Sequence, residues 1–244
     1  MTRNQIKNIL LFGVLCFLLV SALISGLNQN ELTAAGILAS QDSVLPADTS
    51  ASPAPGEVPL ARKVVALTFD DGPHEEITPQ ILDILKKEKV PATFFLMGKK
   101  AEEYPKLVKR MVKEGHQVGN HTYSHVDLSS LSNQQAKEEI QRAQEVIEKI
   151  TGQTPILLRP PFGKVRENEV PEDLIVVEWN VDTLDWTGSS PAQILSRVQK
   201  QVKPGAIILM HDQYEGTVEA LEELIREVRE RGYEFVTVEE LLFF

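Results

Sequence analysis

Adjacent carboxylates in the segment TFDDGP, residues 68–73, form the first group of side chains that could do chemistry. Asp70 and Asp71 would repel each other in a low-dielectric site, so a nearby cation or proton must relieve the repulsion. Gly72 and Pro73 force a turn, which lets the two carboxylates point in different directions and take different roles. Alone, such a motif is more often a solvated turn.

Two imidazoles form a second group, in the segment HTYSH at residues 121–125. His121 and His125 can bind one metal ion if the segment turns helically, and their spacing lies in the usual range for zinc. The single cysteine, Cys16, excludes a disulfide framework and a cysteine-based zinc site. We therefore expect Asp71 and the two histidines to hold a divalent metal, zinc or another ion such as cobalt. Asp70 is then free to act as a general base.

The third group is His211 with Asp185. His211 ends an apolar run that is typical of a buried strand, where a histidine is more often a satisfied core residue. Asp185 follows a neighbouring predicted strand and can keep the imidazole protonated, which suits a general acid. We interpret His74 and His116 as structural, with His74 close enough to the turn after Pro73 to line a cleft.

The elements that position these groups alternate between short apolar runs and longer segments of helical periodicity. Strands are predicted at residues 64–69, 92–97, 117–120, 156–158, 175–180, 206–210 and 234–238, and helices at 78–89, 104–113, 133–150, 191–202 and 217–231. This alternation predicts an α/β fold with parallel strands covered by helices. Because 61–244 is shorter than the roughly 250 residues of an eight-unit barrel, we expect a distorted or incomplete (β/α) barrel.

The chemical groups all follow predicted strands, and the carboxyl ends of parallel strands form one rim where barrel enzymes place their active sites. We therefore expect a single site at this rim. Its members would be Asp70 and Asp71 after the first strand, His121 and His125 after the third, Arg159 after the fourth, Asp182, Asp185 and Trp186 after the fifth, and His211 and Asp212 after the sixth.

The motifs resemble those of the polysaccharide deacetylases, the NodB homology domain or carbohydrate esterase family 4. They are TFDDGP at 68–73, HTYSH at 121–125, RPPF at 159–162, DTLDW at 182–186 and LMH at 209–211, in the family's order. The resemblance implies a distorted (β/α) barrel and hydrolysis of N-acetyl groups on amino-sugar polymers, with a divalent metal, commonly zinc. Acetate and a free amine would be the products.

The resemblance also implies roles for further residues. Arg159 would orient and charge-balance Asp70, and the backbone N–H of Phe162 would help to stabilise the oxyanion. Trp186 and Leu209 would form an apolar pocket for the acetyl methyl group. Asp185 would pair with His211, and His211 would be the general acid, which agrees with the interpretation of this pair from its residue types.

The chain departs from the family pattern at two places. Phe162 stands where the family often has tyrosine, and residues 163–174 are fewer than expected between the motifs, which would open one wall of the groove. The same residues could act as an O-acetyl esterase or hydrolyse a cyclic amide, since they do not depend on the atom that carries the acyl group. A non-catalytic protein that binds cell-wall glycan is a further alternative, although such proteins typically lack a metal ligand or the base.

The N-terminal part has a different character. Residues 9–27 carry no charged side chain and follow Arg3 and Lys7, which is typical of a membrane-spanning helix with a cytoplasmic N-terminus. The alternative is a cleaved signal peptide. We expect residues 1–27 to be this anchor or signal, 28–60 a flexible linker rich in Ala, Ser and Pro, and 61–244 an exported catalytic domain. The domain would be held at the cell surface or secreted, with peptidoglycan or chitin-like oligomers as substrate.

The composition limits the partners. A formal net charge of −10 argues against nucleic-acid binding, which needs a clustered excess of Lys and Arg. The content of 42% hydrophobic and 25% charged residues is typical of a globular protein. We expect a monomer whose partners are an N-acetylated glycan and, through residues 1–27, the membrane.

Overall fold

The computed structural model describes residues 62–243. The predicted membrane segment and the linker lie outside these residues. Within 62–243, no helix is long and apolar enough to cross a bilayer.

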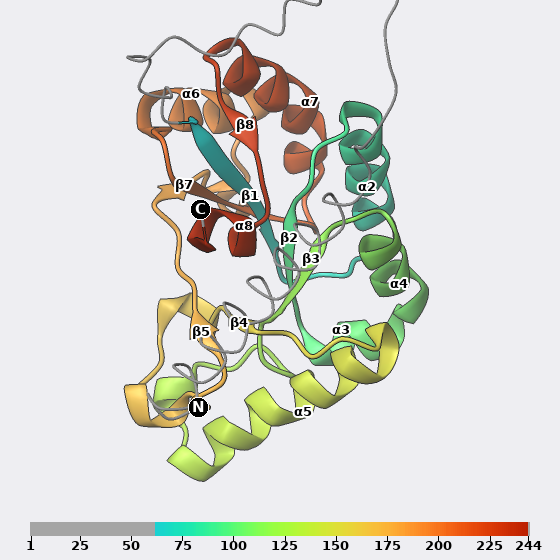
Figure 1. Cartoon of the computed structure of the whole chain (residues 1–244), viewed down its shortest axis with the longest axis vertical. Coiled ribbons are helices and arrows are strands. Elements are labelled where there is room, and N and C mark those ends of the chain that lie inside the picture. The colour runs from blue at the N-terminus through green and yellow to red at the C-terminus, as the bar shows by residue number, and fades with distance from the viewer. Residues whose placement is uncertain (1–61, 244) are drawn as a thin grey trace, which may run out of the picture. The chain divides into compact units, whose positions relative to one another are not determined.

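A single sheet of parallel strands forms the centre of this part of the chain (Figure 1). Its order is β5-β4-β3-β2-β1-β7-β6, and β8 pairs with the start of β1. Because no ladder joins β5 to β6 in residues 62–243, the sheet is a half-barrel, in line with the expected incomplete barrel. The strands are β1 (Val64–Asp70), β2 (Thr93–Leu96), β3 (Gln117–Asn120), β4 (Leu157–Leu158), β5 (Ile175–Val176), β6 (Val181–Asp182), β7 (Ala206–His211) and β8 (Glu234–Phe235).

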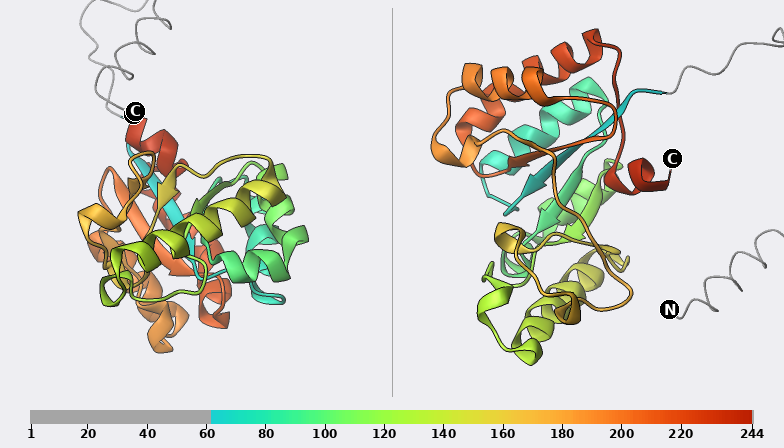
Figure 2. Two further views of the ribbon diagram at one scale, coloured as in Figure 1. Left: turned by 90° about the horizontal axis from the view of Figure 1, so that it is seen from below. Right: turned by 90° about the vertical axis from the view of Figure 1, so that its left-hand side faces the viewer.

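Helices cover the outer face of the sheet, and each of α6, α7, α2, α4 and α5 contacts the next in that order (Figure 2). α3 packs against α5, and α8 packs against β1. The helices are α2 (Ile77–Glu88), α3 (Gly98–Glu103), α4 (Pro105–Lys113), α5 (Asn133–Thr151), α6 (Pro191–Gln201), α7 (Glu215–Glu230) and α8 (Val238–Phe243). Short 3-10 turns are η1 (Leu128–Ser130), η2 (Pro161–Gly163), η3 (Glu167–Glu169) and η4 (Asp185–Thr187).

The alternation of side chains along β1 separates the core from the site. Val65, Leu67 and Phe69 are fully buried in the main apolar cluster, together with side chains of the outer helices. The residues between them face the other side, where Ala66 packs with Phe95, Leu157, Val177 and Val238. Because successive side chains of a strand point to opposite faces, Asp70 lies on this inner side.

The helix predicted at residues 133–150 is confirmed as α5, and its two ends are set by local capping residues. The Ser132 side chain accepts a hydrogen bond from the Gln135 backbone N–H, and the Gln135 side chain accepts one from the Ser132 backbone N–H, which completes a capping box. Gly152 ends the helix at φ 74°, in the left-handed region that glycine enters without steric cost.

The prediction of one strand at 175–180 was wrong. Ile175 and Val176 pair with β4 as β5, whereas the chain then crosses to β7 and forms β6. The Asn180 side chain helps to make this crossing, because its Oδ1 accepts a hydrogen bond from the Ile207 backbone N–H. An apolar run does not reveal that its two ends pair with different strands, and the short helices α3 and α8 were missed as well.

Candidate active site

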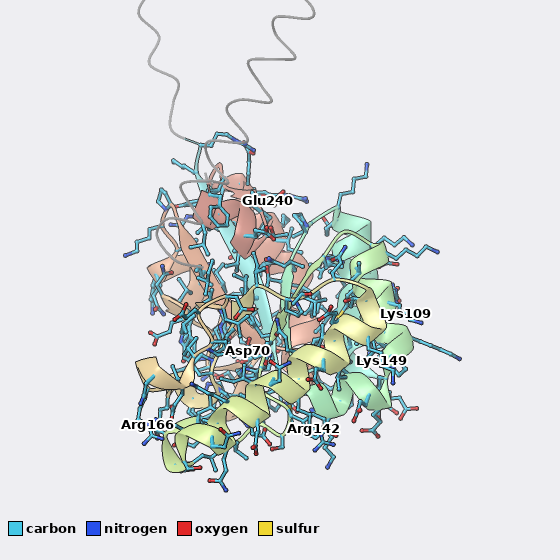
Figure 3. All side chains as sticks on the ribbon, turned by 60° about the horizontal axis from the view of Figure 1, so that its bottom comes forward. Asp70, Lys109, Arg142, Lys149, Arg166 and Glu240 are labelled. Carbon is cyan, nitrogen blue, oxygen red and sulfur yellow. The ribbon has the colours of Figure 1, made fainter. Side chains whose placement is uncertain are left out.

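A cleft of about 440 Å³ opens at the carboxyl ends of the strands, as predicted. Figure 3 shows Asp70 near the middle of the molecule, with Lys109 and Arg166 on opposite sides. The cleft is lined by Asp70, Asp71, His121, His125, Pro160, Phe162, Trp179, Asp182, Trp186, Leu209, His211 and Tyr214. A larger hollow, of about 670 Å³, includes His116 and residues of α5 and α8 but none of these groups.

Three side chains converge on one point of the cleft. The Nε2 atoms of His121 and His125 lie 3.2 Å and 3.0 Å from Asp71 Oδ1. One ligand atom from each of the three residues can be chosen so that all lie within 4.8 Å of one another. Burial raises the pKa of Asp71, but the two imidazoles outweigh it and hold that pKa well below its usual range.

The segment that carries the two imidazoles is not a helical turn. The prediction that a helical turn brings His121 and His125 together was therefore wrong. Residues 121–127 have no helix, and Thr122 and His125 adopt φ 63° and φ 58°. Such left-handed residues are strained and need support from their surroundings. The Asn120 side chain accepts a bond from the Thr122 backbone N–H, and the Glu139 carboxylate accepts bonds from the N–H and hydroxyl of Ser124.

The ring of His121 is oriented by the backbone. Its Nδ1 lies 2.6 Å from the Arg159 carbonyl oxygen, which can only accept a hydrogen bond. Nδ1 therefore donates to this carbonyl oxygen, and Nε2 faces Asp71 Oδ1 in the cleft. This outer contact is typical of histidines that bind metals.

These residues fit a divalent metal ion. Asp71 Oδ1 is buried and has no hydrogen-bond partner among the described residues, although buried carboxylate oxygens are normally satisfied. One carboxylate and two imidazoles are the ligands of many catalytic zinc sites, which keep a fourth position open. Asp71, His121 and His125 would hold the ion.

Asp70 lies beside this cluster and is paired with a buried cation. Arg159 is fully buried, and its Nη1 donates to Asp70 Oδ1 at 2.8 Å and to Thr68 Oγ1 at 2.7 Å. Further bonds run from the guanidinium to the carbonyl oxygens of Val177 and Glu178. A buried arginine charge needs this full set of partners, and its bond to Asp70 fixes the orientation of that side chain.

His211 and Asp185 form the second pair of the cleft. His211 Nδ1 lies 2.8 Å from Asp185 Oδ1, and the His211 backbone N–H donates to Oδ2 at 2.7 Å. The carboxylate also accepts bonds from the Trp186 backbone N–H and the Thr217 hydroxyl. Burial lowers the pKa of His211, but the bond and charge of Asp185 outweigh it and raise that pKa to about 9.

Aromatic and aliphatic side chains form the walls of the cleft. Phe162 and Trp186 are exposed, by 61% and 51%, while Leu209 is buried at the floor. Phe162 adopts φ 61°, and its ring meets that of His125 edge-on at 5.0 Å between centroids. Trp179 and Tyr214 also line the cleft and were not predicted. For Tyr214, the available signal in the sequence was its position only three residues after the predicted site residue His211.

The remaining predicted residues lie apart from the cleft. His74 does not line it, because its Nδ1 faces the backbone N–H groups of Glu76 and Ile77 at the start of α2. His116 is buried, its Nδ1 accepts a bond from the Ala92 backbone N–H, and burial lowers its pKa to about 4. Both are structural, as interpreted from the sequence, but the expectation that His74 lines the cleft was wrong. The expected place of Asp212 in the site was also wrong, because this residue is fully buried and accepts a hydrogen bond from the Thr78 hydroxyl beneath the rim.

Comparison with known proteins gives concordant matches. A family model described as polysaccharide deacetylase matches residues 57–173. The chain is 41% identical over 188 residues to a peptidoglycan-N-acetylglucosamine deacetylase of Bacillus cereus, covering 74% of this chain and 68% of that protein. It is 44% identical over 181 residues to the peptidoglycan-N-acetylmuramic acid deacetylase PdaC of Bacillus subtilis, covering 74% of this chain and 39% of PdaC.

Solved structures agree with these matches. The structure of PdaC superposes with a TM-score of 0.72 at 43% identity, covering 75% of this chain and 91% of the PdaC chain. A pseudoenzyme of the CE4 family from Bacillus anthracis superposes with a TM-score of 0.71 at 36% identity, covering 75% of this chain and 66% of that one. Similarity of fold is therefore shared by active and inactive proteins, and the residues of the cleft must carry the argument for activity.

Proposed function

Because this chain belongs to the polysaccharide deacetylase family, we propose that it is a metal-dependent hydrolase that removes N-acetyl groups from the amino sugars of peptidoglycan. The two peptidoglycan deacetylases compared above by sequence are named for different sugars, N-acetylglucosamine and N-acetylmuramic acid. The proposed substrate is therefore the N-acetylated glycan of peptidoglycan or similar oligomers.

One observation carries the proposal. Asp70 and His211 are register partners on the adjacent parallel strands β1 and β7, so a buried carboxylate and a protonated imidazole stand side by side at the rim. The Asp71, His121 and His125 cluster lies in the same cleft. This arrangement provides a base, an acid and a cation site, which are the groups that amide hydrolysis requires.

The first half of the reaction is attack by water. A divalent ion, when bound, supplies Lewis acidity that polarises the amide carbonyl and lowers the pKa of water. Asp70 accepts the proton of the attacking water, and Arg159 orients that side chain and balances its charge. The backbone N–H of Phe162 donates to the carbonyl oxygen as negative charge develops there.

The second half is loss of the amine. His211 holds one proton on Nδ1 against Asp185, so the proton that it transfers is on Nε2. Nε2 donates this proton to the sugar nitrogen as the C–N bond breaks. Acetate and a free sugar amine leave, while Trp186 and Leu209 enclose the acetyl methyl group.

The non-catalytic alternative is less well supported. A glycan-binding relative without activity would be expected to lack a metal ligand or the base. This chain has the proposed base and acid, Asp70 and His211, and the three proposed metal ligands, Asp71, His121 and His125. O-acetyl ester hydrolysis and cyclic-amide hydrolysis use the same groups, and a substrate panel separates them from N-deacetylation.

We also propose that the catalytic domain acts outside the cytoplasm, as a monomer. The support for export is the apolar stretch at residues 9–27 after Arg3 and Lys7. An anchor and a cleaved signal would both export the domain, and an anchor would also hold it at the cell surface. Size analysis of the mature protein in the membrane and culture fractions separates the two.

Acetate release tests the proposed function. The purified chain would be incubated with N-acetylglucosamine oligomers, with peptidoglycan and with an O-acetylated glycan, after chelation and after zinc or cobalt is added back. We expect metal-restored release of acetate and new free amines from an N-acetylated substrate, and none from the Asp70→Asn variant. Release only from the O-acetylated glycan, or none with metal bound, would contradict the proposal.

A further inference from the structure

Gln213 contacts the carboxylate of the proposed metal ligand from outside the cleft. It lies two residues after His211, and its Nε2 donates to Asp71 Oδ2 at 2.7 Å. Asp71 Oδ1, the other oxygen, faces His121 and His125 and has no hydrogen-bond partner among the described residues. The two oxygens of Asp71 therefore have different surroundings.

Lys100 on α3 fixes the orientation of the Gln213 amide. Its Nζ lies 3.3 Å from Gln213 Oε1, and an ammonium can only donate hydrogen bonds. The amide must then present its oxygen to Lys100 and its NH₂ group to Asp71. A flipped amide would lose both bonds and place two donors against each other.

The same ammonium also supports the backbone of the metal ligand. Lys100 Nζ donates to the Asp71 carbonyl oxygen at 2.8 Å, which closes a ring of three contacts with Gln213. Asp71 adopts φ 72°, a left-handed conformation that is strained for a residue with a side chain. The carbonyl oxygen of the next residue, Gly72, accepts a hydrogen bond from the Met97 backbone N–H at 3.1 Å.

We propose that Gln213 and Lys100 are positioning residues that make Asp71 a one-oxygen metal ligand. The donor on Oδ2 keeps this oxygen from turning toward the ion, so Oδ1 alone faces the two imidazoles. A single ligand oxygen leaves positions free for water and substrate, as catalytic zinc sites require. The inference rests on the proposed metal dependence, but not on which substrate the enzyme cleaves.

Metal affinity of purified full-length variants tests this proposal. Gln213→Met keeps the length of the side chain and removes the donor, and Lys100→Met removes the ammonium. Lys99→Met, at the exposed neighbouring lysine, is the control for Lys100. Gln199→Met is the control for Gln213. Gln199 lies on the exposed surface of α6, and the substitution removes a glutamine–carboxylate bond of 2.8 Å to Glu227 on α7.

Zinc affinity would be measured by competition with a chelator, and coordination by the visible absorption of the cobalt-substituted protein. Loss of an outer-shell partner typically weakens metal binding about tenfold to a hundredfold. We expect losses of that size for Gln213→Met and Lys100→Met, with an altered cobalt spectrum. Neither change is expected in the two control variants.

The double variant of Gln213 and Lys100 gives a second test, since the proposal predicts that it loses little more affinity than Gln213→Met. Zinc affinities within twofold of the parent in both single variants would overturn the proposal. So would an unchanged cobalt spectrum. If Gln213→Met does not fold without metal, Gln213→Ala replaces it under the same criteria. Since metal binding is measured without substrate, failure of the deacetylase proposal and failure of this one are distinguishable.

Discussion

The Asp185→Asn substitution removes the negative charge that faces His211 while it keeps the shape of the side chain. Asp185 Oδ1 lies 2.8 Å from His211 Nδ1, and its bond and charge raise the pKa of His211 against the effect of burial. Without that charge, burial, which disfavours the protonated form, is opposed only by the charges of Asp70 and Asp71. We therefore expect the pKa of His211 to fall well below 9 in the variant.

The structure also gives the magnitude. Against burial, the bond and charge of Asp185 and the charges of Asp70 and Asp71 raise the pKa of His211 from 6.5 to about 9. Each pH unit corresponds to about 1.4 kcal/mol, so protonation of His211 contributes about 3 kcal/mol to the folded state. Because the pKa of His211 is higher in the folded chain than in the unfolded chain, protonation stabilises the folded state. This contribution is fully present below pH 6.5 and is lost as the pH rises to about 9. The free energy of unfolding of the metal-free parent should fall by up to about 3 kcal/mol across this window, and that of Asp185→Asn should not fall in this way.

Imidazole NMR of the metal-free chain measures the pKa directly, with His211→Gln to assign the signal, and urea unfolding at several pH values measures the stability. Thr217→Val is the control. It removes the hydroxyl that donates to Asp185 Oδ2 at 2.7 Å, but it leaves the charge, so the pKa of His211 should stay near 9. A pKa that remains above 8 in Asp185→Asn would refute the electrostatic explanation, as would an equal fall in Thr217→Val.

Four further substitutions probe the other half of the site and the turn beside it. Asp70→Asn is expected to bind metal but to lose about a hundredfold to ten-thousandfold in turnover, because the amide cannot accept the proton, whereas His121→Ala loses metal as well. Arg159→Met leaves Asp70 buried without its cation, which is expected to lower the free energy of unfolding by about 3–5 kcal/mol in urea. Gly72→Ala adds a Cβ that overlaps the buried Asp212 carboxylate, so about 1–3 kcal/mol of stability should be lost in thermal unfolding.

Each of these expectations has a result that would contradict it. Near-normal acetate release by Asp70→Asn would remove that residue as the base. Unchanged urea unfolding of Arg159→Met would show that its ion pair contributes little to folding. For Gly72→Ala, Gly188→Ala is the matched control for added bulk at a glycine, because no atom lies within 4 Å of the new Cβ at Gly188, although its φ of 75° carries strain of its own. A larger loss at Gly188 than at Gly72 would contradict the steric argument.

The elements with local stabilisation could be predicted from sequence. The boundaries of α5 depend on Ser132, Gln135 and Gly152, which lie within or next to the helix, and β3 was predicted to the residue. β5 and β6 could not be separated, because their partners, β4 and β7, lie on opposite sides of the sheet order. The helical turn predicted for the HTYSH segment failed for a similar reason, since its left-handed residues are held by Asn120 and Glu139.

The sequence by itself determined which groups meet at the rim, because a residue that follows a parallel strand lies at its carboxyl end whatever the details of packing. That rule brought Asp70, Asp71, His121, His125 and His211 into one cleft. The tertiary structure alone decided which oxygen of Asp71 is free and which is engaged. That choice depends on Gln213, 142 positions away along the chain, and on Lys100, and hydrogen bonds between such distant residues leave no periodic trace in a sequence.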